Sequence, residues 1–291
     1  MRWLVTGAGG MLGRDLCTVL DRAGEHDVVA ANRQLLDITD ADAVAAAVAG
    51  VDVVVNAAAW TDVDGAQAQE AAATRVNEAG VLARACAATG ARLIQISTDY
   101  VFDGTGTVPY PEDAPTAPVN AYGRSKLAGE RATLAAGGHV VRTAWLYGAH
   151  GANFVSTMLR LAGQRDTVDV VADQQGQPTW SYALAGQVVR LAGAAAAGRA
   201  APGVYHGTAA GQTSWYGLAR AVFAEAGLDP ARVRPTTTDK FPRPAPRPLY
   251  SVLGHARWAG TGVPALPDWR VMLAEAMPTL LSWRPPAVMT T

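Results

Sequence analysis

The sequence predicts an α/β protein built on a doubly wound parallel sheet, followed by a smaller C-terminal α/β domain. Three observations lead to this fold class. Short apolar runs alternate with longer helical patterns in the N-terminal half of the chain. The apolar runs are nearly continuous, as expected for parallel strands that are buried on both faces. Most helical patterns end in glycine, which favours the backbone conformation that closes a helix.

The expected elements follow one another in a regular order. We expect strands at residues 2–7, 27–32, 51–59, 91–98 and 138–147, and helices at 10–24, 40–50, 69–90 and 121–137. After about residue 150 the alternation weakens, and Pro, Gly and Trp become more frequent. We therefore expect one domain over 1–147, completed by a later segment, and a second domain mainly over 148–291.

Composition excludes several function classes. The 291 residues are 49% hydrophobic with a formal net charge of −1, and no dense basic run is present, so neither nucleic-acid binding nor membrane association is expected. No apolar run reaches the length of a membrane span and no signal peptide is recognisable. Cys17 and Cys86 lack metal-ligand spacing and are interpreted as core residues in a reducing compartment. A cytoplasmic location is expected.

The first chemical motif is the segment "VTGAGGMLGRDL", which follows the first expected strand. It places Gly7, Gly10 and Gly13 in a G-x-x-G-x-x-G spacing that opens the first helix. Glycines at such a turn let a pyrophosphate approach the helix N-terminus closely, where its charge is favoured. The motif predicts dinucleotide binding by a Rossmann-type sheet, and so a dinucleotide-binding role for the first domain; a purely structural turn is the alternative.

The end of the second expected strand bears on cofactor choice. An acidic residue usually accepts hydrogen bonds from the ribose hydroxyls there, and this chain offers Asn32 and Arg33 instead. A guanidinium can hold the 2′-phosphate of NADP by charge-assisted hydrogen bonds. We therefore expect NADPH as the preferred cofactor, with Asp37 and Ile38 flanking the adenine. The alternative is that Arg33 is a solvated loop residue.

The segment "NAYGRSK" places Tyr122 and Lys126 four residues apart. On a helix, positions i and i+4 share a face. An ammonium beside a phenol favours the phenolate and lowers a pKa that is normally about 10. The pair is therefore a candidate general acid or base. A surface tyrosine beside a solvated lysine is the alternative.

Further motifs occur in one order along the chain. They are "NAAAWTDVD", "STDYVFDGTG", "YGRSKLAGE", "RTAWLYG", "NFVSTMLRLA", "DQQGQPT" and "RPLYSVL". With the glycine turn and the Y-x-x-x-K pair, they resemble the extended short-chain dehydrogenase/reductases and, within these, the dTDP-4-dehydrorhamnose reductase family. The resemblance runs from the first strand to near residue 273.

The resemblance implies reduction of a dTDP-4-keto-6-deoxy sugar by NADPH, with NADH also accepted. Tyr122 would protonate the carbonyl oxygen, Thr98 would donate a second hydrogen bond to it, and Lys126 would hold the nicotinamide ribose and tune the phenol. Asn77 matches a residue that supports a proton relay in such enzymes; a buried structural role is the alternative.

Other contacts are implied by the same resemblance. The cofactor would meet Gly10, Met11 and Leu12 at its pyrophosphate, and Ala58, Ala59 and Thr61 along its nicotinamide half. The substrate would meet Thr98, Asp99, Trp145, Asn153 and Arg247. The indole of Trp145 has a core role as its alternative. The segment "FPRPAPRPLY" is interpreted as a rigid loop that presents Arg247 to the diphosphate, rather than as a polyproline ligand.

Two features leave other interpretations open. Some relatives dimerise through Mg²⁺ held by glutamates, but Asp15 stands in the corresponding place, so no metal is expected and a homodimer is left open. A non-catalytic nucleotide-binding regulatory subunit is one competing function class. A sugar-nucleotide epimerase or dehydratase is another, although Tyr100 stands where the related dehydratases carry their basic glutamate.

Overall fold

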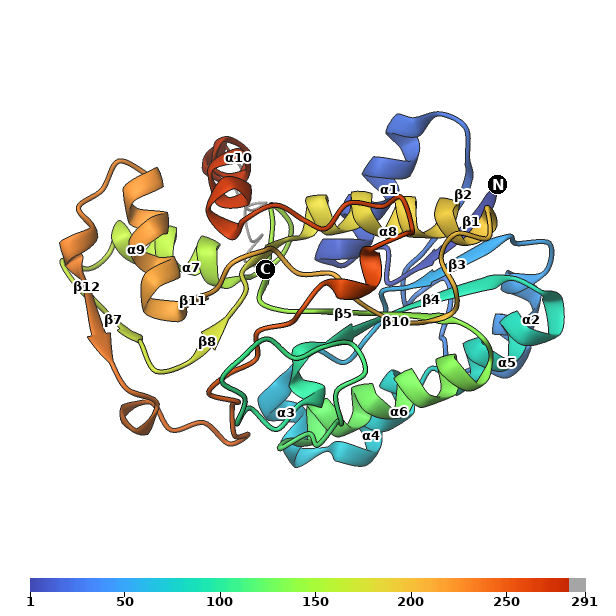
Figure 1. Cartoon of the computed structure of the whole chain (residues 1–291), viewed down its shortest axis with the longest axis horizontal. Helices are drawn as coiled ribbons and strands as arrows, with labels where there is room; N and C mark the ends of the chain where they lie inside the picture. The colour runs from blue at the N-terminus through green and yellow to red at the C-terminus, as the bar shows by residue number, and fades with distance from the viewer. Residues whose placement is uncertain (283–291) are drawn as a thin grey trace, which may run out of the picture.

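The computed structural model of the chain describes residues 1–282. Its centre is a six-stranded parallel sheet with the strand order β10-β5-β4-β3-β1-β2 (Figure 1). The strands are β1 (Arg2–Thr6), β2 (Asp27–Ala31), β3 (Val53–Asn56), β4 (Arg92–Thr98), β5 (His139–Thr143) and β10 (Gly203–His206). The strand order reverses direction between β1 and β3, which is the position where doubly wound sheets bind ligands. The predicted fold class is confirmed.

Helices cover both faces of the sheet, as Figure 1 shows. One face carries α1 (Met11–Ala23) and α8 (Ser181–Ala196), and the other carries α2 (Ala41–Val48), α4 (Glu70–Asn77), α5 (Gly80–Thr89) and α6 (Ala121–Ala135). Neighbouring residues of β1 explain why its sequence is continuously apolar. Trp3 and Val5 belong to the core that includes α1 and α8, whereas Leu4 belongs to the core that includes α2 and α5.

Two expected elements are interrupted. The helix expected over 69–90 is two helices, because Ala79 adopts a left-handed conformation with φ 51° between α4 and α5. Helix α6 crosses here at close range: a Cβ on Gly129 would overlap the carbonyl oxygen of Asn77. The strand expected over 138–147 is also divided, since Trp145 has φ 46° between β5 and β6 (Leu146–Tyr147). A short helix, α3 (Val63–Ala68), was not expected.

The C-terminal half contributes to two parts of the molecule. Its segment α8–β10 returns to the central sheet, where β10 pairs with β5. Most of the remainder lies at the left of Figure 1, and its apolar side chains pack into the same core as those of α1 and α8. Its helices are α7 (Phe154–Ala162), α9 (Trp215–Glu225) and α10 (Trp269–Ser282). Its short strands form the pairs β7 (Val168–Val171) with β12 (Val233–Thr236), β8 (Gln175–Gly176) with β11 (Thr213–Ser214), and β6 with β9 (Thr179–Trp180).

An irregular segment, residues 241–254, follows β12 and is called the strap below. Hydrogen bonds fix it on two sides. Tyr110 donates its N–H to the Val252 carbonyl at 2.9 Å, and Gln175 donates its N–H to the Leu249 carbonyl at 2.7 Å. The strap thus joins the Pro-rich loop at 108–120 to β8 in the C-terminal half.

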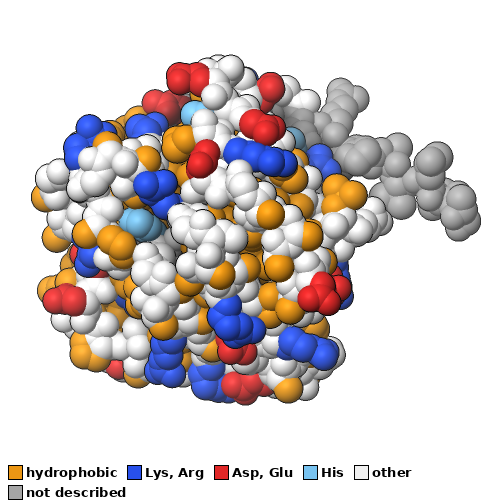
Figure 2. Space-filling view, turned by 90° about the vertical axis from the view of Figure 1, so that its right-hand side faces the viewer, with side chains coloured by type: hydrophobic (Ala, Val, Ile, Leu, Met, Phe, Trp, Pro, Cys, Tyr) orange, Lys and Arg blue, Asp and Glu red, His pale blue; other side chains and the backbone are white. Residues whose placement is uncertain are grey.

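Short 3₁₀ turns complete the described chain, and its surface is mixed in charge. The turns are η1 (Asp99–Val101), η2 (Pro230–Arg232), η3 (Thr238–Lys240) and η4 (Ala256–Trp258). Within residues 1–282, no helix combines the length and apolarity needed to cross a membrane. On the face seen in Figure 2, basic and acidic side chains are interspersed.

Candidate active site

The glycine turn after β1 has the geometry of a phosphate cradle. Gly7 has φ 66°, and a Cβ there would lie 2.6 Å from the backbone nitrogen of Ala58. A Cβ on Gly13 would overlap the Gly7 carbonyl oxygen. Gly10 precedes α1 and has no side chain to cap it, so the first N–H groups of this helix are available to an anion.

This turn borders a cavity of about 1060 Å³. This volume is at the top of the range found for small-molecule sites. The open glycine cradle at one end of the cavity fits a dinucleotide. Every residue expected to contact the cofactor lines the cavity. They are Gly7, Gly10, Met11, Leu12, Asn32, Arg33, Asp37, Ile38, Ala58, Ala59, Thr61, Tyr122 and Lys126.

The end of the cavity near β2 carries two arginines. Arg33 is exposed and lines it, and so does Arg75 of α4, which the sequence did not single out. A basic residue on a helix has no sequence signal that separates a ligand contact from a solvated charge. Asn32 shapes the turn, because its Oδ1 accepts the N–H groups of Gln34 and Leu35 at 2.9 and 3.1 Å.

Asp37 lies in the same part of the cavity. The N–H and the hydroxyl of Thr39 donate hydrogen bonds to its carboxylate and hold its pKa below the ordinary value, and the charges of Arg33 and Arg75 act in the same direction. Asp37 is therefore ionised at neutral pH. The carboxylate of Asp37 and the two guanidinium groups thus gather opposite charges at this end of the cavity.

Tyr122 and Lys126 lie on the first turns of α6. The helix begins where Asn120 accepts the Gly123 N–H through its side chain at 2.8 Å. The ammonium of Lys126 is buried and donates to the Ile96 carbonyl at 2.6 Å. Burial lowers the pKa of Lys126 to about 8, and the Glu130 carboxylate one turn further along opposes this effect. Both side chains reach the cavity, so the expectation that they share a face of the helix holds.

The expected direction of the Tyr122 pKa was wrong. Burial and, secondly, the charge of Asp99 raise the pKa of Tyr122 to about 12, while the Thr98 side chain opposes them. The spacing of Tyr122 and Lys126 in the sequence indicates that a lysine is near the phenol, but it does not indicate how deeply the phenol is buried. The chemical consequence favours acid catalysis, because a phenol with this pKa is protonated at neutral pH and can donate a proton.

Thr98 and Asp99 lie where β4 ends, beside Tyr122. The Thr98 hydroxyl donates to Oδ1 of Asp99 at 3.0 Å and accepts the N–H of Tyr100 at 3.2 Å. Burial raises the pKa of Asp99 to about 7, against hydrogen bonds from Ser251 and Thr98. The structure thus brings three hydroxyl or carboxyl groups together at the carboxyl end of the sheet. Asp99 and Thr98 are both buried.

Tyr100, the residue next along, is neutral as well. Burial, followed by the charge of Asp99, raises the pKa of Tyr100 well above its ordinary value. Its ring meets the ring of Tyr122 edge-on, with centroids 6.0 Å apart. A carboxylate base is therefore absent at this position, and the tyrosine supplies packing instead.

Two of the residues expected to contact substrate, Trp145 and Asn153, make contacts within the protein. Trp145 is stacked on Trp215, with ring centroids 3.6 Å apart, and a Cβ on Gly176 would overlap its indole ring. The indole is therefore packed against Trp215 and Gly176. Asn153 caps α7 by accepting the Ser156 N–H at 3.0 Å, and its Nδ2 donates to the Gly148 carbonyl at 2.9 Å.

Asn77 and Asp15 have structural contacts. Asn77 bonds both the N–H and the carbonyl of Trp60 and also donates to the Ser125 hydroxyl, which supports its structural alternative. Asp15 is buried beside α8 and accepts a hydrogen bond from the Ser181 hydroxyl. Within residues 1–282, His, Cys, Asp and Glu side chains form no group of three that could hold a metal ion.

Comparison with known proteins places these features in a family. The family model described as "RmlD substrate binding domain" matches residues 1–282. The chain belongs to this family. The resemblance predicted from the motifs is confirmed, and it extends past residue 273 to the end of the described chain.

Members of the family with known names are similar over nearly the whole chain. A dTDP-4-dehydrorhamnose reductase of Streptomyces griseus is 54% identical, over 96% of this chain and 94% of its own. A dTDP-4-keto-6-deoxy-D-glucose reductase of Streptomyces niveus is 50% identical, over 96% and 97%. The solved structure of a dTDP-4-dehydrorhamnose reductase from Bacillus anthracis, in complex with NADP, has a TM-score of 0.89 at 35% identity and covers 95% of this chain and 98% of its own.

Proposed function

We propose that this protein reduces the 4-keto group of a dTDP-4-keto-6-deoxy sugar to a hydroxyl group, with NADPH as the preferred reductant. One observation carries the proposal: Tyr122, whose raised pKa keeps it protonated, borders a dinucleotide-sized cavity together with Lys126. The names of the relatives, which are reductases of dTDP-4-keto sugars, support the same reaction. The function lies in deoxysugar biosynthesis.

The residues divide the chemical work as follows. NADPH, when bound, supplies a hydride to the carbonyl carbon of the sugar. Tyr122 donates its proton to the oxygen on which negative charge develops, and Thr98 donates a second hydrogen bond to that oxygen. A positioned general acid contributes about 10²–10⁴-fold to the rate. Lys126, held by the Ile96 carbonyl, binds the nicotinamide ribose and stabilises the phenolate that Tyr122 becomes.

The cofactor residues divide along the cavity. Gly7, Gly10 and the first turn of α1 hold the pyrophosphate, with Met11 and Leu12 beside it, and Ala58, Ala59 and Thr61 border the nicotinamide half. Arg33 and Arg75 hold the 2′-phosphate, while Asp37 and Ile38 flank the adenosine. Since Asp37 and Asn32 can accept hydrogen bonds from ribose hydroxyls, NADH is expected to bind more weakly but still to serve.

The substrate lies on the other side of the catalytic residues. Asp99 and Trp145 border the sugar, and Arg247 binds the diphosphate. Asn153 acts through the loop it fixes, residues 148–152, of which Gly151 and Ala152 line the cavity. We assign dinucleotide binding to residues 1–147 together with the segment α8–β10, and substrate binding mainly to the rest of 148–291.

Epimerase or dehydratase chemistry is disfavoured by Tyr100. Abstraction of the C5 proton needs a base, and the raised pKa of this phenol makes it a poor one. A purely regulatory nucleotide-binding role is disfavoured by the intact group of Thr98, Tyr122 and Lys126.

The test is incubation with dTDP-4-keto-6-deoxy sugars and NADPH, followed by NMR analysis of the product. We expect a 4-hydroxy sugar and one NADPH oxidised per sugar, and no product from Tyr122→Phe on the same time scale. Absence of turnover on every 4-keto sugar, despite NADPH binding, would favour the regulatory role.

A further inference from the structure

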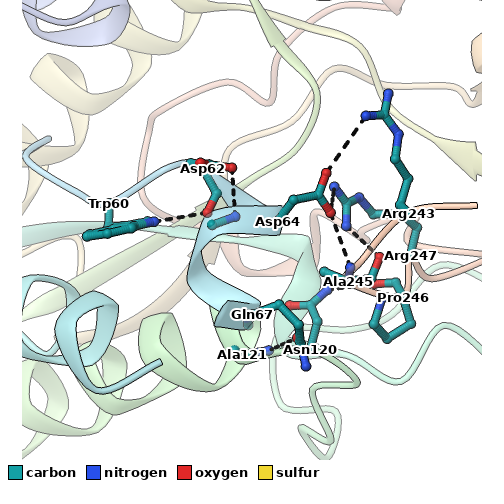
Figure 3. Close-up of polar contacts among 12 residues, drawn as sticks. Trp60, Asp62, Asp64, Gln67, Asn120, Ala121, Arg243, Ala245, Pro246 and Arg247 are labelled. Atoms are coloured by element: carbon teal, nitrogen blue, oxygen red, sulfur yellow. Dashed lines mark hydrogen bonds and ion pairs between the residues drawn. The ribbon is translucent and has the colours of Figure 1, made fainter. Parts of the chain in front are cut away.

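One carboxylate joins α3 to the strap, as Figure 3 shows. Oδ1 of Asp64 lies 3.0 Å from Nη2 of Arg247 and accepts the N–H of Ala245 at 3.2 Å. Its other oxygen lies 3.8 Å from Nη1 of Arg243. The two arginines differ in exposure: the side chain of Arg247 is 17% exposed and that of Arg243 is 64% exposed. Asp64 therefore fixes Arg247 firmly, whereas its pairing with Arg243 is a weak surface contact.

Arg247 keeps donors available after these contacts. Its Nη1 donates to the Ala245 carbonyl at 2.7 Å and its Nη2 pairs with Asp64. A guanidinium has five N–H donors in a rigid plane, so a further edge remains for a ligand. The two contacts lock the plane in one orientation, and this lowers the entropy lost when an anion binds.

The charge of Arg247 also acts on Tyr100. Burial and the Asp99 charge raise the pKa of Tyr100, and the Arg247 charge opposes them. The Tyr100 ring packs edge-on against that of Tyr122.

The strap and α3 are tied to the start of the catalytic helix. Asn120 donates from Nδ2 to the Pro246 carbonyl at 2.9 Å, and its Oδ1 caps α6 at Gly123. Gln67 of α3 accepts the Ala121 N–H at 3.1 Å. Both bonds lie within two residues of Tyr122. The position of Arg247 is therefore set relative to the phenol through one connected set of contacts (Figure 3).

We propose that Asp64 is a positioning residue that holds Arg247 as the binding group for the diphosphate of the nucleotide substrate. The proposal rests on the proposed function for the identity of that diphosphate. Asp64 itself carries the wrong charge to bind the ligand, so its effect on affinity passes through Arg247. Arg243 is not needed for it.

The test compares Asp64→Asn, Arg247→Ala and the double variant in two assays. Calorimetry measures the binding of dTDP, and steady-state kinetics measures KM for the sugar nucleotide, KM for NADPH and kcat. We expect Asp64→Asn to weaken dTDP binding and raise the sugar-nucleotide KM about tenfold, the scale of one charge-assisted hydrogen bond. NADPH KM and kcat should change less than about twofold. Arg243→Ala is the matched control, expected to change dTDP affinity by less than about threefold.

The double variant decides whether Asp64 acts through Arg247. If it does, Asp64→Asn should add little to Arg247→Ala, because the group to be positioned is already gone. Asp64→Glu keeps the charge and should retain most of the dTDP affinity; it also serves if Asp64→Asn fails to fold.

Several results would overturn the proposal. They are unchanged dTDP affinity in Asp64→Asn, additive losses in the double variant, and equal losses of NADPH and dTDP affinity, which would indicate general damage to the fold. Failure of the proposed function is distinguishable. If dTDP binds and the variants behave as expected while no 4-keto sugar is reduced, the positioning role stands and the reaction assignment falls.

Discussion

Replacement of Asp99 by asparagine should stabilise the protein in a pH-dependent way. Burial, against hydrogen bonds from Ser251 and Thr98, raises the pKa of Asp99 from the ordinary 3.8 to about 7. Between these pH values the native state binds more protons than the unfolded chain, so the free energy of unfolding falls as pH rises. Each pKa unit corresponds to about 1.4 kcal/mol, and the ionised carboxylate therefore costs the fold about 4 kcal/mol above pH 7.

An asparagine side chain at this position would be neutral at every pH and would not carry this cost. Urea unfolding of the parent and Asp99→Asn, measured from about pH 5 to pH 8, should give curves that separate as pH rises and run parallel above about pH 7. The largest difference should approach about 4 kcal/mol, which is a sizeable part of a typical stability of about 5–15 kcal/mol. A difference that stays constant from about pH 5 to pH 8 would refute the assignment of this pKa to Asp99.

Asp103→Asn is the control with the opposite electrostatics. Hydrogen bonds from the N–H and hydroxyl of Thr105 and from Tyr110 lower the pKa of Asp103. The stability that this carboxylate contributes is present above its unfolded pKa and is lost only as pH falls below that value. Asp103→Asn should therefore be less stable than the parent by an amount that does not change between about pH 5 and pH 8.

Three further predictions concern the reaction. Tyr122→Phe should lower kcat by about 10²–10⁴-fold with little change in NADPH KM; near-normal turnover would exclude Tyr122 as the proton donor. Lys126→Ala should lower kcat and also raise NADPH KM, because its ammonium serves both the phenol and the ribose; an effect on kcat alone would remove the ribose contact. Arg33→Ala should raise KM about tenfold for NADPH but not for NADH, and Arg75→Ala should act in the same direction; equal KM values for both cofactors in the parent would remove the case for both arginines.

The fold could be predicted because its strands are buried on both faces. The apolar residues of β1 pack into two cores, one on each face of the sheet. The glycine turn after β1 indicates where the first helix begins. The division of residues 69–90 into α4 and α5 could not be predicted. The break lies where Gly129 of α6 closely approaches Asn77, a contact between residues 52 positions apart that no local pattern contains (129 minus 77).

The candidate site could likewise be predicted only in part. Glycines at a turn have a direct steric meaning, so the glycine turn that borders the cavity could be predicted from the sequence itself, whereas Ala58, Ala59 and Thr61 were expected from the family resemblance. Arg75 could not be predicted, because its place on the cavity depends on how α4 packs. The pKa of Tyr122 was predicted in the wrong direction, since burial and Asp99 outweigh any effect of helical spacing. The pairing of Arg247 with Asp64 joins segments 183 positions apart (247 minus 64).

The central claim, direct reduction at C4, is tested by isotope transfer. The protein is incubated with a dTDP-4-keto-6-deoxy sugar and NADPH that carries deuterium at the reactive nicotinamide position, and in a parallel reaction with unlabelled NADPH in D₂O. Reduction predicts one deuterium at C4 of the product per cofactor oxidised in the first reaction. In the second, it predicts no solvent deuterium at C5 beyond the spontaneous background. Enzyme-dependent deuterium at C5, or turnover without net oxidation of NADPH, would contradict the claim and indicate an epimerase or dehydratase.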